Sequence, residues 1–99
     1  MLIAFIDIHI SDDLSLSKLE KFFLYSGPYL SRCFKEITGL SIQTYIIKKR
    51  VCLAKKLIEG GMDMQSVCDT AGFGNYSNFS RTFLQYTGQS PKAYRQAMS

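Results

Sequence analysis

The sequence is poor in the residues that build catalytic and metal sites. Its 99 residues include one histidine and three cysteines, and tryptophan is absent. A lone His9 and cysteines without a short paired spacing do not supply the ligands of a zinc site. The chain also lacks a phosphate-binding glycine loop and paired catalytic carboxylates. The sequence therefore predicts a protein that is not an enzyme and that needs no metal or cofactor.

Long apolar stretches are missing as well. No apolar run approaches the roughly 20 residues that a membrane helix needs, and the start of the chain does not have the pattern of a signal peptide. We interpret Cys33, Cys52 and Cys68 as small buried residues in a reducing compartment. We therefore expect one small cytoplasmic domain with no membrane partner, whose core is drawn from the 46% of residues that are apolar.

What the chain does have is an uneven distribution of charge. Residues 1–28 carry two basic and four acidic side chains, residues 29–58 carry seven and one, and residues 59–99 carry three of each. The net charge of +4 is thus the sum of −2, +6 and 0. Concentrated positive charge is typical of proteins that bind a polyanion. An ordinary solvated helix face is the alternative for Lys55 and Lys56.

One stretch of the chain occurs twice. Residues 29–45, YLSRCFKEITGLSIQTY, align with residues 78–94, NFSRTFLQYTGQSPKAY, at an offset of 49. An internal repeat is a stronger guide to architecture than local propensity, and two copies are too few for a stacked solenoid. The repeat predicts two related helical units. The identical pairs are Ser31/Ser80, Arg32/Arg81, Phe34/Phe83, Thr38/Thr87, Gly39/Gly88, Ser41/Ser90 and Tyr45/Tyr94.

Capping residues predict where the helices begin and end. Ser26, Ser41 and Asp63 are each suited to cap a helix, and Thr38-Gly39 and Thr87-Gly88 are suited to end the two repeat helices. Ser90-Pro91 opens a last short helix. Residues 2–10 are expected to form a helix, and a strand is the alternative because apolar residues alternate from Ile6 to Ile10. A second helix begins near Ser15, where Ser17 and Glu20 match a capping box.

Apolar residues at helical spacing predict the inner faces of these helices. The predicted inner residues are Leu16, Leu19, Phe22 and Phe23 in the first short helix, Leu30, Phe34 and Ile37 in the first repeat helix, and Phe79, Phe83 and Tyr86 in the second.

A short helix, a tight turn and a second helix with exposed polar residues form a helix-turn-helix, and this order occurs twice. The predicted fold is all-α, with about seven helices. It comprises a first unit in residues 1–40, a linker helix in residues 41–59 and a second unit in residues 60–99. A linker helix of roughly 18 residues is about 27 Å long, which suits two recognition helices in major-groove segments about 34 Å apart.

The spaced residues of the second half resemble the DNA-binding domain of AraC/XylS-type bacterial transcription regulators. They are Ala71-Gly72-Phe73, Phe79-Ser80-Arg81-x-Phe83 and Tyr86-Thr87-Gly88-x-Ser90-Pro91-x-x-Tyr94-Arg95. Leu30-Ser31-Arg32-x-Phe34-Lys35 and Thr38-Gly39 add to the resemblance, which covers about residues 14–95.

The resemblance implies sequence-specific binding of double-stranded DNA by a transcription regulator, more specifically an activator that contacts RNA polymerase. Most members of the family attach a domain for effector sensing and dimerisation on the N-terminal side, which this sequence does not include, so the chain is either a fragment of such a regulator or a short, free-standing member. The alternative from the residues alone is a helical protein-interaction module without sequence-specific DNA binding.

The resemblance also assigns DNA-contacting residues. Base-reading positions fall on Pro28, Tyr29, Ser31 and Arg32 in the first unit, with Lys35 near a phosphate. In the second unit they fall on Asn75, Tyr76, Ser77, Asn78, Ser80 and Arg81. Lys48 and Lys49 of the linker helix are expected to contact phosphates. Arginine suits guanine and asparagine suits adenine, because each forms a bidentate contact to that base.

Some of these residues have alternative roles, and the chain departs from the family pattern at three positions. Arg32 and Arg81 could pair with acidic neighbours instead of DNA, and for Arg50 a structural pairing is expected. Glu20 and Cys68 stand where the family usually has a small alanine at the contact between the paired helices, so Glu20 puts the packing of the first unit in doubt. Leu84 replaces a common lysine, so we expect weaker electrostatic binding by the second unit.

Overall fold

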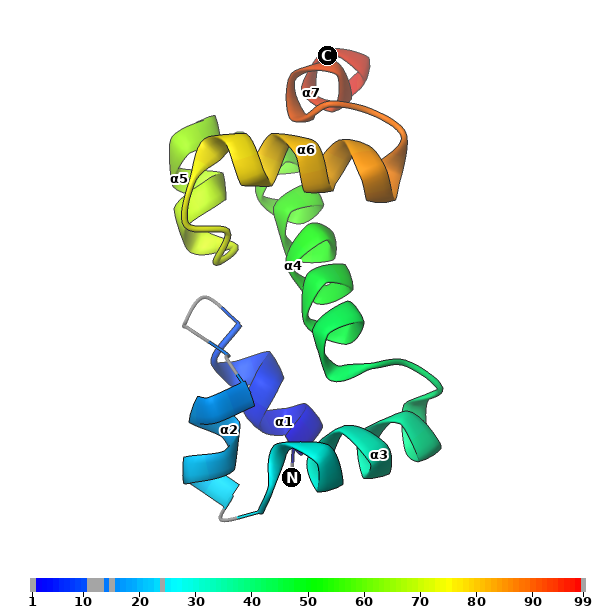
Figure 1. Cartoon of the computed structure of the whole chain (residues 1–99). Helices are drawn as coiled ribbons and strands as arrows, with labels where there is room; N and C mark the ends of the chain where they lie inside the picture. The colour runs from blue at the N-terminus through cyan, green and yellow to red at the C-terminus, as the bar shows by residue number, and fades with distance from the viewer. Residues whose placement is uncertain (1, 11–13, 15, 24, 99) are drawn as a thin grey trace.

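The structure, a computed structural model, describes the chain except for residues 1, 11–13, 15, 24 and 99. The described residues form seven α-helices and no strand, so the predicted all-α fold is confirmed (Figure 1). The helices are α1 (Leu2–Ile8), α2 (Leu16–Phe23), α3 (Gly27–Thr38), α4 (Ile42–Glu59), α5 (Met64–Thr70), α6 (Tyr76–Thr87) and α7 (Pro91–Met98).

The three predicted helix caps are confirmed. The side chains of Ser26, Ser41 and Asp63 accept hydrogen bonds from the third residues of α3, α4 and α5, at 3.3, 3.1 and 3.0 Å. Asn75 caps α6 in the same way, at 2.7 Å. A cap of this kind satisfies an amide that has no partner within the helix, so these four residues define where the helices begin.

The two repeat helices end in the same way. Gly39 and Gly88 have φ angles of 77° and 80°, a left-handed conformation that glycine adopts without a steric penalty. The hydroxyl of the preceding threonine donates to the carbonyl of Phe34 over 2.8 Å in α3, and to that of Phe83 over 2.7 Å in α6. The shared sequence therefore produces a shared exit turn.

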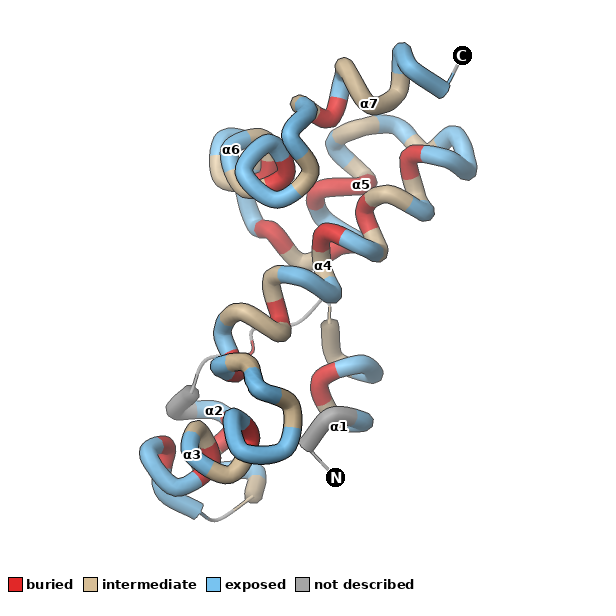
Figure 2. The backbone as a smooth tube through the Cα atoms, turned by 90° about the vertical axis from the view of Figure 1, so that its right-hand side faces the viewer, coloured by how far each residue is buried: buried red, intermediate tan, exposed pale blue. Residues whose placement is uncertain are grey.

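The buried apolar residues form two separate cores, both of which include residues of α4. Figure 2 marks the buried positions in red along the backbone. Ile42 and Ile46, near the start of α4, pack with residues of α1, α2 and α3. Val51, Ala54 and Ile58, further along α4, pack with residues of α5 and α6. Since α4 turns one side to each core, it links the two helix pairs as the predicted linker helix.

The molecule is elongated, with extents of 45 × 22 × 21 Å. In Figure 1, α4 runs between the helix pair α2–α3 at the bottom and the pair α5–α6 at the top. In Figure 2, α3 and α6 both lie on the left of the view, whereas α1 lies at the lower right and α7 at the top. The second helix of each pair is therefore on the same side of the molecule.

Three predicted inner residues are exposed instead. The side chains of Phe22, Ile37 and Tyr86 are 63%, 77% and 37% exposed. Phe22 lies outside the first core and contacts the ring of Phe5, with ring centroids 4.2 Å apart. Ile37 and Tyr86 occupy the last turns of α3 and α6, where neither helix has a buried residue, so the apolar spacing continues beyond the part of each helix that packs.

Two further predictions are wrong. The capping box is not formed, because α2 begins at Leu16, so that Ser17 already lies within the helix, and Glu20 binds the amide of Gly27 instead. Burial holds for Cys68 but not for Cys52, which is exposed on α4. Burial raises the pKa of the Cys68 thiol, in keeping with a neutral packing role.

Candidate nucleic-acid interface

Five of the seven identical pairs in the repeat have a structural role. Phe34 and Phe83 are buried in the two cores. Tyr45 and Tyr94 pack edge-on against them, with ring centroids 5.1 and 5.6 Å apart and an interplanar angle of 71° in both pairs. The repeated threonine, glycine and serine form the exit turns and the caps that follow. Packing and turn geometry thus account for these identities.

The remaining identical pairs are Ser31/Ser80 and Arg32/Arg81, on α3 and α6. Both arginines are exposed and both serines are half-buried. Among the described residues, none of these four side chains forms a hydrogen bond or an ion pair. No acidic partner for either arginine is therefore found in this part of the chain. The repeated Ser-Arg dipeptide remains as a polar feature at equivalent places on the two helices.

The other candidates of the first unit lie at or near the start of α3. Pro28 and Lys35 are exposed, and the side chain of Tyr29 is 47% exposed. The Tyr29 ring lies 5.2 Å from the ring of Tyr25, which sequence reasoning missed because Tyr25 precedes the helix. A hydrogen bond with Cys33 is the main cause that raises the pKa of Tyr29, although Arg32 opposes the shift. The Tyr29 hydroxyl is therefore a protonated donor at neutral pH.

The candidates of the second unit divide into engaged and free side chains. Asn75 is the cap of α6, and the amide of Asn78 donates from Nδ2 to the carbonyl of Phe73 over 3.4 Å. Tyr76 packs against the second core, with its ring 5.7 Å from that of Phe79. Ser77 is exposed. The start of α6 is therefore stabilised by contacts of Asn75, Tyr76 and Asn78. No such structural contact is found among the described residues for Ser77 or for the Ser80-Arg81 dipeptide.

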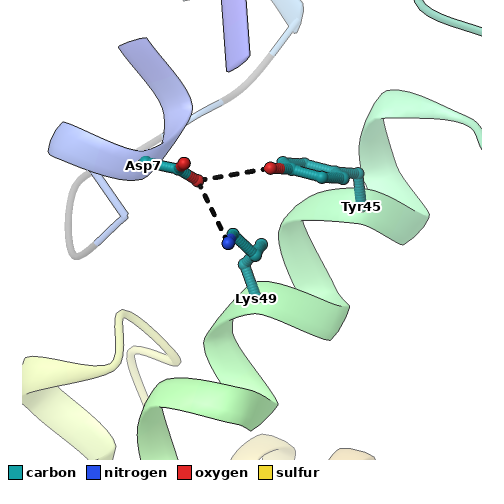
Figure 3. Close-up of polar contacts among 3 residues, drawn as sticks. All are labelled: Asp7, Tyr45 and Lys49. Atoms are coloured by element: carbon teal, nitrogen blue, oxygen red, sulfur yellow. Dashed lines mark hydrogen bonds and ion pairs between the residues drawn. The ribbon is translucent and has the colours of Figure 1, made fainter. Parts of the chain in front are cut away.

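The two lysines of the linker helix differ. Lys48 is exposed, whereas the Lys49 ammonium lies 3.7 Å from the carboxylate of Asp7 on α1 (Figure 3). The same carboxylate accepts a hydrogen bond from the Tyr45 hydroxyl at 3.4 Å. The pKa of Tyr45 is raised, by burial first and by Asp7 second. Asp7 thus balances part of the charge of Lys49 but not that of Lys48.

Arg50 is a structural residue, as expected. Its Nε donates to the carbonyl of Ile10 over 3.0 Å, which fastens the segment after α1 to α4.

The described residues contain no group of three or more His, Cys, Asp or Glu side chains that could bind a metal ion. No described helix combines the length and the apolar character needed to cross a membrane. A pocket of about 260 Å³ lies at α1 and α4, lined by Asp7, Ile10, Lys49, Cys52, Leu53 and Lys56.

Comparison with known proteins identifies the family. A family described as a helix-turn-helix domain matches residues 19–97. The chain belongs to this AraC-type helix-turn-helix family. The match includes α3 to α6 in full and leaves α1 outside.

Relatives of this AraC-type domain agree in sequence and fold. The uncharacterized HTH-type transcriptional regulator YobQ of Bacillus subtilis is 37% identical over 97 residues, which are 97% of this chain and 40% of YobQ. The C-terminal domain of AraT, a response regulator from Geobacillus stearothermophilus, is 29% identical with a TM-score of 0.91, covering 95% of this chain and 79% of that one.

A third similar protein is the DNA-binding domain of AdpA, solved in complex with a target DNA. It is 27% identical with a TM-score of 0.87, covering 96% of this chain and 86% of that one. Sequence-specific DNA binding is the function of this AraC-type domain. Membership of this family also confirms the prediction that the chain is not an enzyme.

Proposed function

We propose that this AraC-type domain reads two adjacent major-groove segments of double-stranded DNA, with α3 in one and α6 in the next. The observation that carries the proposal is the repeated Ser-Arg dipeptide, whose arginine is exposed on both helices and whose side chains have no hydrogen bond or ion pair among the described residues. An arginine side chain with free donors can bind guanine through two hydrogen bonds. Two such arginines at equivalent places are what a two-site reader needs.

The shape of the molecule supports this reading. The α3 and α6 helices lie at opposite ends of a molecule 45 Å long and on the same side of α4 (Figures 1 and 2). Successive major-groove segments on one face of DNA are about 34 Å apart. A molecule of this length can therefore lie along one face of the duplex with a helix in each segment.

The proposed contacts fall into two classes. In the first unit, Tyr29, Ser31 and Arg32 contact bases, and Pro28 lies next to them at the start of α3. In the second unit, Ser77, Ser80 and Arg81 contact bases, and Asn75, Tyr76 and Asn78 lie next to them at the start of α6. Lys35, Lys48 and Lys49 bind phosphates, which sets register without reading sequence. Because Asp7 lies beside Lys49, Lys48 makes the larger electrostatic contribution of the two.

The wider context is proposed from the family. The three-part division is a first unit in residues 1–40, a linker helix in residues 41–59 and a second unit in residues 60–99. The regulator acts in the cytoplasm as an activator that contacts RNA polymerase. A separate effector and dimerisation domain lies on the N-terminal side of such domains.

Selection from a pool of random DNA duplexes at moderate salt tests the proposal. We expect recovery of two short motifs, spaced by about one helical turn of roughly 10–10.5 bp. A single motif would refute the joint reading by two units. Absence of any enrichment would favour a protein-interaction module and refute base reading altogether.

A further inference from the structure

Glu20 forms a contact between the two helices of the first unit. Its carboxylate, on α2, accepts a hydrogen bond from the backbone amide of Gly27, the first residue of α3. Gly27 is buried and Glu20 is half-buried, so this amide has little access to water. The first amides of a helix have no partner within it, and a buried amide without an acceptor is costly. Glu20 supplies an acceptor that α3 itself lacks.

The other amides in the first turn of α3 are satisfied locally. Pro28 has no amide proton. The amide of Tyr29 donates to the hydroxyl oxygen of Ser26 over 3.3 Å, and that of Leu30 donates to the Ser26 carbonyl over 3.0 Å. Both of these acceptors belong to the cap residue of α3. The hydrogen bond from Gly27 to Glu20 is different, because it connects the start of α3 to another helix.

The second unit is built differently at the corresponding place. Cys68 of α5 stands there and is fully buried, as a small residue can be where two helices approach closely. The first unit has a carboxylate instead, which reaches the helix start rather than filling the space between the helices. The polar contact thus replaces close packing as the connection between the two helices.

We propose that Glu20 is a positioning residue for base reading by the first unit. The inference rests on the proposed function, since it concerns the side chains that α3 presents to DNA. Tyr29 and Arg32 lie within two turns of Gly27 on α3, so the position of the first turn of α3 determines the positions of these two side chains. The doubt that Glu20 raised about the packing of the first unit is answered by this contact, which joins the helices instead of separating them.

Two substitutions of Glu20 distinguish loss of the hydrogen-bond acceptor from any other change to the side chain. Glu20→Gln keeps an oxygen acceptor, whereas Glu20→Ala removes it. The full-length variants and the wild type are each used to select from random duplexes. The first-unit motif is identified as the one that Arg32→Ala relaxes. We expect Glu20→Ala to weaken binding to that motif roughly tenfold and to keep the second motif, and Glu20→Gln to stay within about threefold of wild type.

Asp69→Ala is the matched control. Asp69 is an exposed residue on α5, the short helix of the second unit, and among the described residues its carboxylate accepts a hydrogen bond only from Gln65 of the same helix. This variant has the same change of charge as Glu20→Ala, so wild-type motifs are expected from it. An equal loss of the first motif in Asp69→Ala would overturn the inference, because charge alone would then explain the result.

Two other outcomes would overturn the positioning role. One is full binding of the first motif by Glu20→Ala, and the other is a loss in Glu20→Gln as large as in Glu20→Ala. If Glu20→Ala loses helix content by circular dichroism, exchange of the Gly27 amide is compared in the wild type and in Glu20→Gln. Protection in both proteins supports the contact, and exchange in the wild type as fast as that of a free amide refutes it. If the wild type selects no motif, the proposed function fails, while the exchange experiment still tests the contact.

Discussion

The core of the second unit is built around a chain of aromatic rings, whereas the buried core of the first unit is aliphatic except for Phe34. In the second unit, Phe73, Phe79, Phe83 and Tyr94 follow one another with ring centroids 5.0, 5.7 and 5.6 Å apart. At the place of Phe79 the first unit has Leu30. One repeated sequence therefore supports two cores of different composition, because the copies share the exit turns and the Phe34–Tyr45 and Phe83–Tyr94 ring pairs but differ at other core positions.

The first unit and the linker helix, and not the second unit, carry the excess of positive charge. The basic excess lies in residues 29–58, on α3 and the linker helix, whereas residues 59–99 are balanced. Lys35 on α3 corresponds to Leu84 on α6, which is 50% exposed. We therefore expect the second unit to contribute more to stability and the first unit more to the electrostatic attraction of DNA. Each of the following predictions tests one side of that division.

The largest effect is expected from Phe79→Ala compared with Leu30→Ala. Phe79 is fully buried and contacts rings on both sides, so we expect Phe79→Ala to lower the free energy of unfolding by about 3–5 kcal/mol. Leu30→Ala should cost less, by about 2–3 kcal/mol. Urea unfolding followed by circular dichroism measures both. A larger cost for Leu30→Ala would reverse the proposed order of stability.

Substitution of the repeated arginines is expected to have the next largest effect. Arg32→Ala and Arg81→Ala should each weaken binding to a selected duplex by about 1–3 kcal/mol and relax one base position in its own motif. Lys92→Ala, an exposed basic residue of α7 outside the proposed interface, is the control. Titrations with duplexes that differ at single positions provide the measurement. Unchanged base preference in either arginine variant would remove that residue from base reading.

Exchange of Lys35 and Leu84 between the units should produce a smaller change. Leu84→Lys is expected to steepen the dependence of log affinity on log salt by about 0.9, and Lys35→Leu to flatten it by the same amount, since each phosphate contact contributes about that much. Gln85→Lys adds the same charge to a neighbouring face of α6. The idea that residue 84 faces a phosphate is wrong if Gln85→Lys and Leu84→Lys change the slope equally.

The smallest effect is expected on the stability at low pH, through the cap residue Asp63. The hydrogen bond from the Ser66 amide is the main cause that lowers the pKa of Asp63, the cap of α5. A lowered pKa in the folded state means that this stabilisation is present near neutral pH and is lost as the pH falls below about 4. Asp63→Ser keeps a cap that does not titrate, so the difference in Tm between it and wild type should change through this range. A difference in Tm that stays constant with pH would show that titration of Asp63 does not contribute to the loss of stability in acid.

The repeat and the capping residues were sufficient to predict the order of the helices and the two-unit fold. Such signals are local, because a cap or an exit turn is decided within a few residues. Exposure of Phe22, Ile37 and Tyr86 could not be predicted in this way, since apolar spacing does not indicate where a neighbouring helix stops. The contact between Glu20 and Gly27 depends on how α2 and α3 pack against each other, which the sequence pattern does not show. The local spacing of Ser17 and Glu20 therefore indicated a capping box within α2 instead.

The identical exit turns have a consequence for construction of longer DNA readers. Ser41 starts α4 after the first turn, and Ser90 starts α7 after the second, with the same cap and with Tyr45 and Tyr94 at the same place. The α7 helix therefore begins after its exit turn with the same cap and the same ring contact as α4. A fusion that lengthens the 8 residues of α7 to the 18 of α4 and adds a copy of the second unit would extend the reader along the duplex.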